Sequence, residues 1–151
     1  MDTPITEFDL KIRFEIYRFF VENGRAPLFP ELAGILKVDE ELVRQSYHHL
    51  HNGHMIFLNQ GSDTIRMAFP FSAVPTKFKV KRGQTQWWAN CAWDSVGIPA
   101  AIHHDVEIEA VYADSGETAH FRVQNGCFDG KGHVVYFPLP FRQWYDDLVF
   151  T

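Results

Sequence analysis

The chain changes its hydrophobic periodicity after about residue 51, and this change limits the folds that it can adopt. Up to that point, apolar residues recur at the three- and four-residue spacing of amphipathic helices, and two apolar runs that suit a hairpin follow before Pro70. Beyond Pro75, apolar and polar residues alternate in short runs that are typical of strands. Pro70 and Pro75 bound an extended connector, because the residue before a proline is disfavoured in helical geometry. The sequence therefore predicts an α+β protein with a boundary near residue 75.

Three short helices and a hairpin are expected in the first half. Asn23 and Gly24 form a helix stop, and Asp39 can cap the third helix through its carboxylate. A polar five-residue turn separates the two apolar runs of the hairpin. Helices are predicted over 8–21, from 29 or 30 to 36, and from 40 to about 51, with hairpin strands at 54–58 and 64–69. This order predicts a winged-helix-like subdomain over residues 1–75.

A mostly antiparallel or mixed sheet with one central helix is expected over residues 76–151. The helix should span about Ala92 to Ile102, directly after a strand. Cys91 therefore lies at a junction where a strand ends and a helix begins. The predicted strands are 77–80, 86–89, 106–112, 119–123 and 133–137.

Composition and charge exclude several classes of protein. The longest uncharged apolar runs are much shorter than a membrane span, and the first thirty residues do not resemble a signal peptide. The net charge is −5, and neither half is basic enough to present a nucleic-acid surface. Cys91 and Cys127 lack the spacing of a structural zinc site. We therefore expect a cytoplasmic protein with free thiols, without a membrane partner and without a nucleic-acid partner.

Cys91 and Asp94 are the residues best placed to carry chemistry. A helix N-terminus favours a thiolate, so we expect the pKa of Cys91 to fall. Asp94 lies three residues later and shares a helical face with the thiol, where its carboxyl group can act as a proton carrier. The alternative is that Cys91 is a small buried hydrophobe and Asp94 a first-turn helix charge. The spacing alone leaves both interpretations open.

The segment Cys91 to Pro99, with the sequence Cys-Ala-Trp-Asp-Ser-Val-Gly-Ile-Pro, resembles the signature of the alkylmercury lyase (organomercurial lyase) family. The segment 69–76 resembles a connector found in lyase-like members, and Ser115-Gly116-Glu117 falls where they have a Thr-Gly turn. A winged-helix first half also agrees with their architecture. The resemblance covers nearly the whole chain and implies a carbon–mercury lyase.

The resemblance implies that Cys91 and Asp94 are catalytic and hold the metal. Such an enzyme cleaves a small organomercurial by protonolysis and releases a hydrocarbon. Hg(II) remains as the bound product on cysteine sulfur, and no cofactor is required. Cytosolic thiols or a mercuric reductase would then accept the Hg(II), as in mercury resistance. A thiolate suits this role because Hg(II) is a very soft metal.

The chain departs from the family pattern at a second catalytic cysteine. In family enzymes that cysteine follows the segment corresponding to residues 144–151, where the present sequence ends. Cys91 and Asp94 therefore match two of the three catalytic residues, and cleavage by these 151 residues is expected to be impaired. Cys127 is a candidate substitute, and the alternative is an ordinary thiol in a glycine-rich loop.

Two other functions stay open. One is a lyase-like protein that binds metal without catalysis. The other is a winged-helix transcriptional regulator. The helix that would bind the DNA groove, however, has one basic residue, Arg44, and three acidic residues at 39–41, which phosphates would repel. His48 and His51 have a spacing that can bind a metal, but the usual alternative is an exposed pair. Trp87, Trp88 and Trp93 can wall an apolar pocket at Cys91, or pack in the core.

Overall fold

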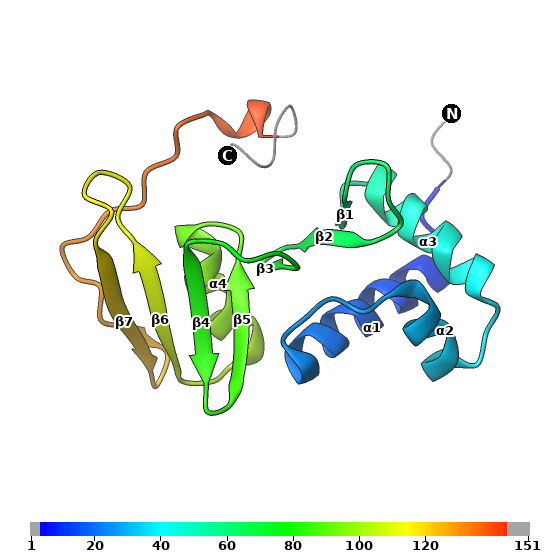
Figure 1. The fold of residues 1–151 in the computed structure, drawn as a ribbon, viewed down its shortest axis with the longest axis horizontal. Coiled ribbons are helices and arrows are strands. Elements are labelled where there is room, and N and C mark those ends of the chain that lie inside the picture. Colours follow the sequence, from blue (N-terminus) through cyan, green and yellow to red (C-terminus); the bar gives the residue numbers. More distant parts are fainter. Residues whose placement is uncertain (1–3, 145–151) are drawn as a thin grey trace.

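The computed structural model describes residues 4–144, which form four α-helices and eight strands. Figure 1 shows helices α1–α3 gathered at one end of the molecule and strands β4–β7 at the other, with β3 between them. The elements are α1 (Glu7–Asn23), α2 (Phe29–Leu36), α3 (Glu40–Asn52), β1 (Phe57–Leu58), β2 (Ile65–Ala68), β3 (Phe71–Ser72), β4 (Phe78–Arg82), β5 (Thr85–Ala89), α4 (Ala92–Ile102), β6 (Val106–Val111), β7 (Thr118–Gln124), β8 (Cys127–Phe128) and the 3-10 turn η1 (Phe141–Gln143).

The eight strands form one sheet in the order β1-β2-β3-β5-β4-β6-β7-β8, and every pair is antiparallel. This confirms the α+β class and the antiparallel alternative for the sheet. The two-residue strand β3 lies inside the expected connector and pairs with β2 on one side and β5 on the other. Phe71 faces Ala89, and Ser72 faces Trp88. The backbone of the connector therefore joins the first hairpin to the larger part of the sheet.

Local sequence explains where the first helices begin and end. Thr6 and Asp9 form a capping box at α1, in which each side chain accepts a hydrogen bond from the backbone N–H of the other residue. The Asp39 carboxylate accepts the N–H of Glu41 at 2.8 Å, which confirms the expected cap of α3. Gly24 ends α1 at φ 69°, and a Cβ there would overlap the Gln86 carbonyl oxygen. A glycine is therefore required by both the turn and the approach to β5.

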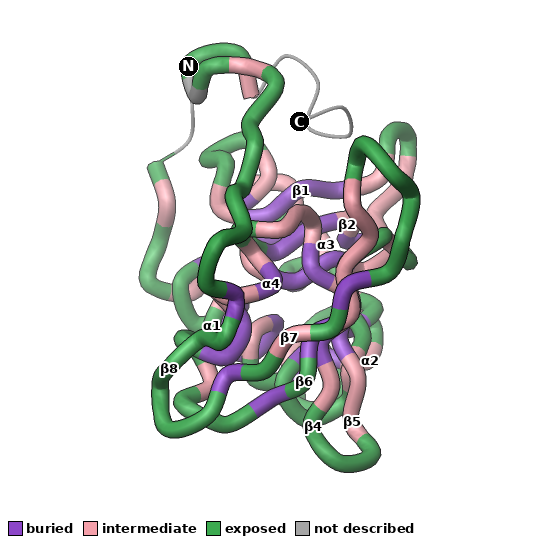
Figure 2. The backbone as a smooth tube through the Cα atoms, turned by 90° about the vertical axis from the view of Figure 1, so that its left-hand side faces the viewer, coloured by how far each residue is buried: buried purple, intermediate pink, exposed green. Residues whose placement is uncertain are grey.

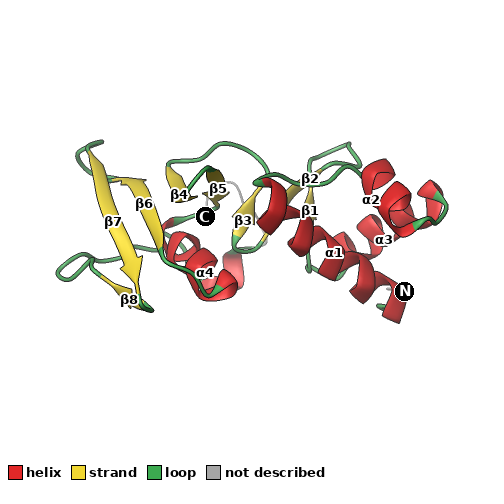
Figure 3. Ribbon diagram, turned by 90° about the horizontal axis from the view of Figure 1, so that it is seen from below, coloured by secondary structure: helices red, strands yellow, loops and turns green. Residues whose placement is uncertain are grey.

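A continuous apolar core joins α1 to the sheet. The Trp87 indole of β5 is buried and donates to the Phe20 carbonyl of α1 at 2.8 Å. The rings of Phe20 and Phe71 stack with centroids 5.2 Å apart. Figure 2 shows buried segments on helices and strands, whereas much of the chain after β8 is exposed. On the other side of the junction, α4 packs against β4, β5 and β6 (Figure 3).

The structure corrects the end of the strand prediction. Residues 133–137 are not a strand, and their alternation buries no face, since Val134 is 91% exposed and Tyr136 is 79% exposed. Strand β8 was not predicted. It forms because Asn125 and Gly126 both adopt positive φ and make a two-residue hairpin from β7. The segment 144–151, which precedes the second catalytic cysteine in family enzymes, lies outside the described residues except for Trp144.

The other predicted helices and strands are confirmed to within a few residues. The division at residue 75 stays a prediction. Within residues 4–144, no helix is both long enough and apolar enough to cross a membrane.

Trp87→Phe is expected to lower the free energy of unfolding by about 1–3 kcal/mol, because it removes a buried hydrogen bond and leaves a void beside α1. Urea denaturation followed by circular dichroism measures this change. Trp93→Phe is the matched control, since the Trp93 side chain is 61% exposed and should cost little. Equal losses in the two variants would contradict the role of Trp87 in joining α1 to the sheet.

Candidate active site

The Cys91 thiol lies at the start of α4, as the sequence predicts. Cys91 is the N-cap residue with an extended backbone, and its Sγ accepts the N–H of Asp94 at 3.5 Å. Its carbonyl accepts the first helical hydrogen bond, from Ser95 N–H at 3.1 Å. Gly97 lets α4 approach the connector, because a Cβ there would lie 3.2 Å from Cβ of Pro70. The start of α4 and the connector together therefore fix the position of the Cys91 thiol.

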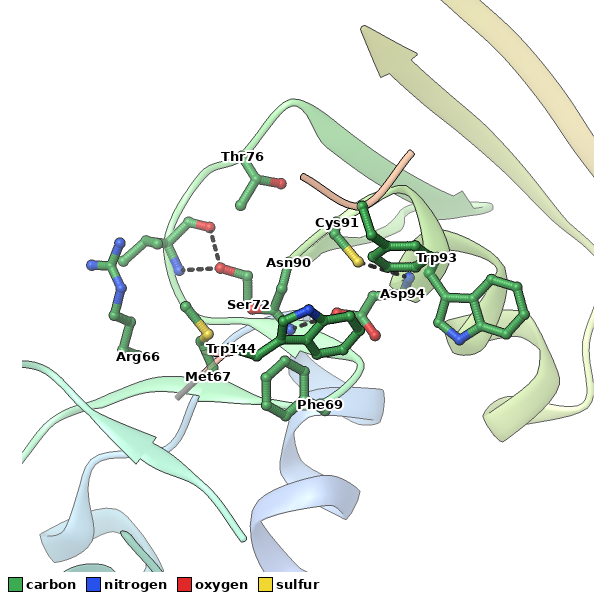
Figure 4. Close-up of a pocket in the computed structure, with 12 residues that line it drawn as sticks. Arg66, Met67, Phe69, Ser72, Thr76, Asn90, Cys91, Trp93, Asp94 and Trp144 are labelled. Atoms are coloured by element: carbon green, nitrogen blue, oxygen red, sulfur yellow. Dashed lines mark hydrogen bonds between the residues drawn. The ribbon is translucent and has the colours of Figure 1, made fainter. Parts of the chain in front are cut away.

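A cavity of about 120 Å³ opens beside Cys91 and Asp94. Its walls combine the start of α4 with residues from β2, β3 and the connector, including Met67, Ser72 and Thr76. Figure 4 shows Arg66 on the far side of the cavity from Cys91 and Asp94. Four aromatic side chains also line the cavity: Phe69, Trp93, Phe137 and Trp144. The cavity is therefore largely apolar around one thiol and one carboxyl group.

Asp94 is a buried carboxyl group with an altered acidity. Burial raises its pKa to about 6, although hydrogen bonds from Asn90 and from the Cys91 thiol act in the opposite direction. The Asn90 amide donates to Asp94 Oδ2 at 3.2 Å. A group with this pKa can both accept and release a proton near neutral pH.

The acidity of Cys91 differs from the sequence prediction. Burial raises the pKa of Cys91 to about 11, and the negative charge of Asp94 raises it further than burial alone would. Hydrogen bonds from the backbone at the helix start lower it, as expected, but these are smaller effects. The prediction of a lowered pKa is therefore wrong, because it omitted the desolvation of the thiol and the charge of its neighbour. At neutral pH the free site holds a thiol beside a largely ionised carboxyl group.

The remaining candidate residues lie elsewhere or have structural roles. Cys127 is exposed on β8 and does not line the cavity. His48 pairs with Asp63 at 2.6 Å, and residues 4–144 contain no group of three potential metal-ligating side chains of the His, Cys, Asp or Glu type. Of the three tryptophans near Cys91, Trp93 lines the cavity, whereas Trp87 is in the core and Trp88 lies under the Lys79 ammonium group.

Sequence reasoning missed several residues that form the cavity. Asn90 lies just before the family signature at residues 91–99, and no sequence pattern marks it as a site residue. Phe69 was assigned to the hairpin strand 64–69 and to the connector-like segment 69–76, Thr76 to that segment, and Phe137 to a strand. The pairing of β3 with β5 brings Asn90 to the Phe71 carbonyl, and Phe137 reaches the cavity from the loop after β8, where its ring stacks on Trp144. Local periodicity predicts neither approach.

The comparisons with known proteins now identify the family. The family model for alkylmercury lyase (MerB) matches residues 71–151, which is more than half of the chain. The chain belongs to the alkylmercury lyase family. The match includes β3, the Cys91 helix and the sheet beyond it.

A solved structure supports the fold of this family member. The structure, described as the mercury-bound form of MerB2, superposes with a TM-score of 0.66 and 23% sequence identity. The superposition covers 82% of the present chain and 59% of the MerB2 chain, so the present chain spans less than two thirds of that chain's length. No curated protein sequence matches the chain significantly.

The rate at which iodoacetamide alkylates Cys91 is expected to keep rising above pH 9, because the thiolate forms with a pKa of about 11. Asp94→Asn should shift this profile to lower pH, since it removes a negative charge that opposes thiolate formation. Mass spectrometry of the Cys91 peptide, in a Cys127→Ser background, gives the rates. A plateau below pH 8.5 in the parent protein would show that burial does not control the thiol.

Proposed function

We propose that the protein is an organomercurial lyase in which Cys91 captures the metal and Asp94 carries the proton that cleaves the carbon–mercury bond. One observation carries this proposal: the thiol and a carboxyl group with a pKa of about 6 share one apolar cavity at the start of α4. Membership of the alkylmercury lyase family supports it. Cys91 and Asp94 would both contact the mercury.

The first step is capture of the substrate. The Cys91 sulfur bonds to mercury, the substrate loses its original thiolate or halide ligand, and the thiol proton moves to the Asp94 carboxylate. The high pKa of Cys91 does not prevent this step, because the soft metal displaces the proton as it binds sulfur. The thiol and the carboxylate line the same cavity, three residues apart at the start of α4, so the proton has only a short distance to move. After capture, Asp94 is neutral and holds one proton.

The second step breaks the carbon–mercury bond. A further sulfur ligand donates electron density to mercury, the bonding pair moves to carbon, and Asp94 gives its proton to that carbon. The products are a hydrocarbon, Hg(II) on sulfur and an ionised Asp94, so the proton from the thiol ends on the hydrocarbon. The apolar walls favour the step, because a buried carboxyl group delivers its proton in competition with little water. Hg(II) is thus a product, and the chemistry requires no resident cofactor.

The source of the second sulfur determines the rate. Among the described residues, Cys91 supplies the one thiol that lines the cavity. A small external thiol can enter beside mercury and complete the coordination. We also propose that cytosolic thiols or a mercuric reductase accept the Hg(II), and that the protein acts in the cytoplasm in mercury resistance.

Phenylmercury is expected to be captured rapidly by these 151 residues and cleaved slowly, with benzene release accelerated by excess small thiol. Asp94→Asn should still capture the compound but slow its cleavage by about 10²-fold or more, because the general acid is lost. Single-turnover release of benzene, measured by gas chromatography, tests both statements. Mass spectrometry measures capture in the same samples.

The cysteine variants serve as controls for this experiment. Cys91→Ser should abolish the adduct, whereas Cys127→Ser should leave both the adduct and the cleavage rate unchanged. An adduct that disappears only in Cys127→Ser would refute the assignment of Cys91. Capture without benzene release at any thiol concentration would instead favour the alternative function, a lyase-like protein that binds metal without catalysis.

We further propose that residues 1–75 form a winged-helix-like subdomain that covers the sheet and does not bind DNA. Support comes from the apolar faces that α1 directs at β3 and β5, where Phe20 meets Phe71 and Trp87. The exposed side of α3 is not suited to entering a DNA groove or to binding DNA phosphates. Its Arg44 guanidinium is already paired with the Glu41 carboxylate through contacts of 2.6 and 2.7 Å.

The protein is therefore expected to show no binding to duplex DNA at physiological salt. Fluorescence anisotropy with a labelled random duplex measures this, first at low salt and then at physiological salt. Arg44→Ala should leave the signal unchanged. Duplex binding that persists at physiological salt and is lost in Arg44→Ala would support a transcriptional regulator instead.

A further inference from the structure

The side-chain amide of Asn90 links Asp94 to the backbone of β3. Asn90 lies between the last residue of β5 and the Cys91 N-cap. Its Nδ2 donates to Asp94 Oδ2 at 3.2 Å and to the Phe71 carbonyl at 3.3 Å. We propose that Asn90 is a positioning residue that holds the Asp94 carboxylate beside the Cys91 thiol. The inference rests on the proposed function, in which Asp94 carries the proton.

The Phe71 carbonyl fixes which way the Asn90 amide faces. Both neighbours of Nδ2 are hydrogen-bond acceptors, and a half-turn of the amide would place Oδ1 against two oxygens. The Oδ1 atom itself is buried without a hydrogen-bond partner among the described residues. An unpaired buried acceptor is unfavourable, so the two N–H bonds are what hold the amide in place. Asn90 therefore presents a donor to Asp94 in a fixed direction.

This direction matters for the proton transfer. The Asp94 carboxylate accepts a hydrogen bond from Asn90 and lines the same cavity as the Cys91 thiol. A carboxylate without the Asn90 bond can rotate about its side-chain torsions and leave the thiol. Proton transfer requires hydrogen-bond contact between donor and acceptor, so fixed placement of the carboxylate contributes to the rate. Because the anchor is the backbone of β3, the sheet itself sets the position of the carboxyl group.

The test uses the charge that Asp94 places beside the thiol. In a Cys127→Ser background at pH 8.5, Cys91 is alkylated in parallel with neutral iodoacetamide and with anionic iodoacetate. Both reagents attack the thiolate, so the ratio of the two rates is independent of the fraction of thiolate. A neighbouring carboxylate repels iodoacetate, and Asp94→Asn gives the ratio without that charge. The charge should change the ratio roughly three- to tenfold.

Asn90→Leu and Asn90→Ala are expected to move the alkylation ratio most of the way from the parent value to the Asp94→Asn value. Two variants are used because the test needs only one of them to fold, and circular dichroism checks the folding of each. Asn23→Leu is the matched control, because it removes a side-chain amide hydrogen bond, donated to the Phe19 carbonyl at 3.0 Å, that lies away from the cavity. The positioning role would be overturned if the folded Asn90 variants had the same alkylation ratio as the parent. It would also be overturned if Asn23→Leu changed the ratio as much as the Asn90 variants do.

Phenylmercury supplies a second readout that separates this inference from the proposed function. The Asn90 variants should capture the compound as the parent does but release benzene about tenfold more slowly. Parent-like benzene release in the Asn90 variants would overturn the positioning role while leaving the proposed function intact. Absence of benzene release from the parent even with excess small thiol would refute the proposed function, and the alkylation ratio would still decide whether Asn90 positions Asp94.

Discussion

The pairing of β3 with β5 is the interaction on which the site depends. Two residues, Phe71 and Ser72, connect the first hairpin to the main sheet through this pairing. The same strand brings the Phe71 carbonyl to Asn90 and the Phe71 ring to Phe20 of α1. Without the pairing, the cavity beside Cys91 would lose the wall that β2, β3 and the connector provide. A short strand therefore determines whether a helix start becomes an enclosed site.

Enclosure changes the chemistry of the two polar groups in a consistent direction. Burial raises the pKa of Cys91 to about 11 and the pKa of Asp94 to about 6. The free protein therefore stores the proton on sulfur and leaves the carboxyl group mostly ionised. A thiol in this state resists ordinary alkylation and oxidation, because both reactions require the thiolate. A soft metal can still displace the proton, so burial favours metal capture over other thiol chemistry.

The sequence predicted the parts of the fold that local patterns control. The Asp39 cap and the apolar periodicity place the first helices, and the strand-to-helix junction places Cys91 beside Asp94. Long-range packing determined the rest. The acidity of Cys91 depends on burial by residues distant in sequence, and Asn90 acquires a role only when Phe71 lies opposite Ala89. The strand expected at 133–137 failed because alternation alone does not provide a partner strand.

The family signature and the rest of the chain therefore contribute different things to the site. Residues 91–99 fix the distance between the thiol and the carboxyl group through one turn of helix, and this geometry needs little help from other residues. Their environment comes from β2, the connector and β3, where Met67, Phe69 and the Phe71 carbonyl approach the start of α4. The same Cys and Asp on an exposed helix would have ordinary acidities and no hydrogen bond from Asn90 to hold the carboxylate. Sequence changes in the connector should therefore alter reactivity even when both site residues are retained.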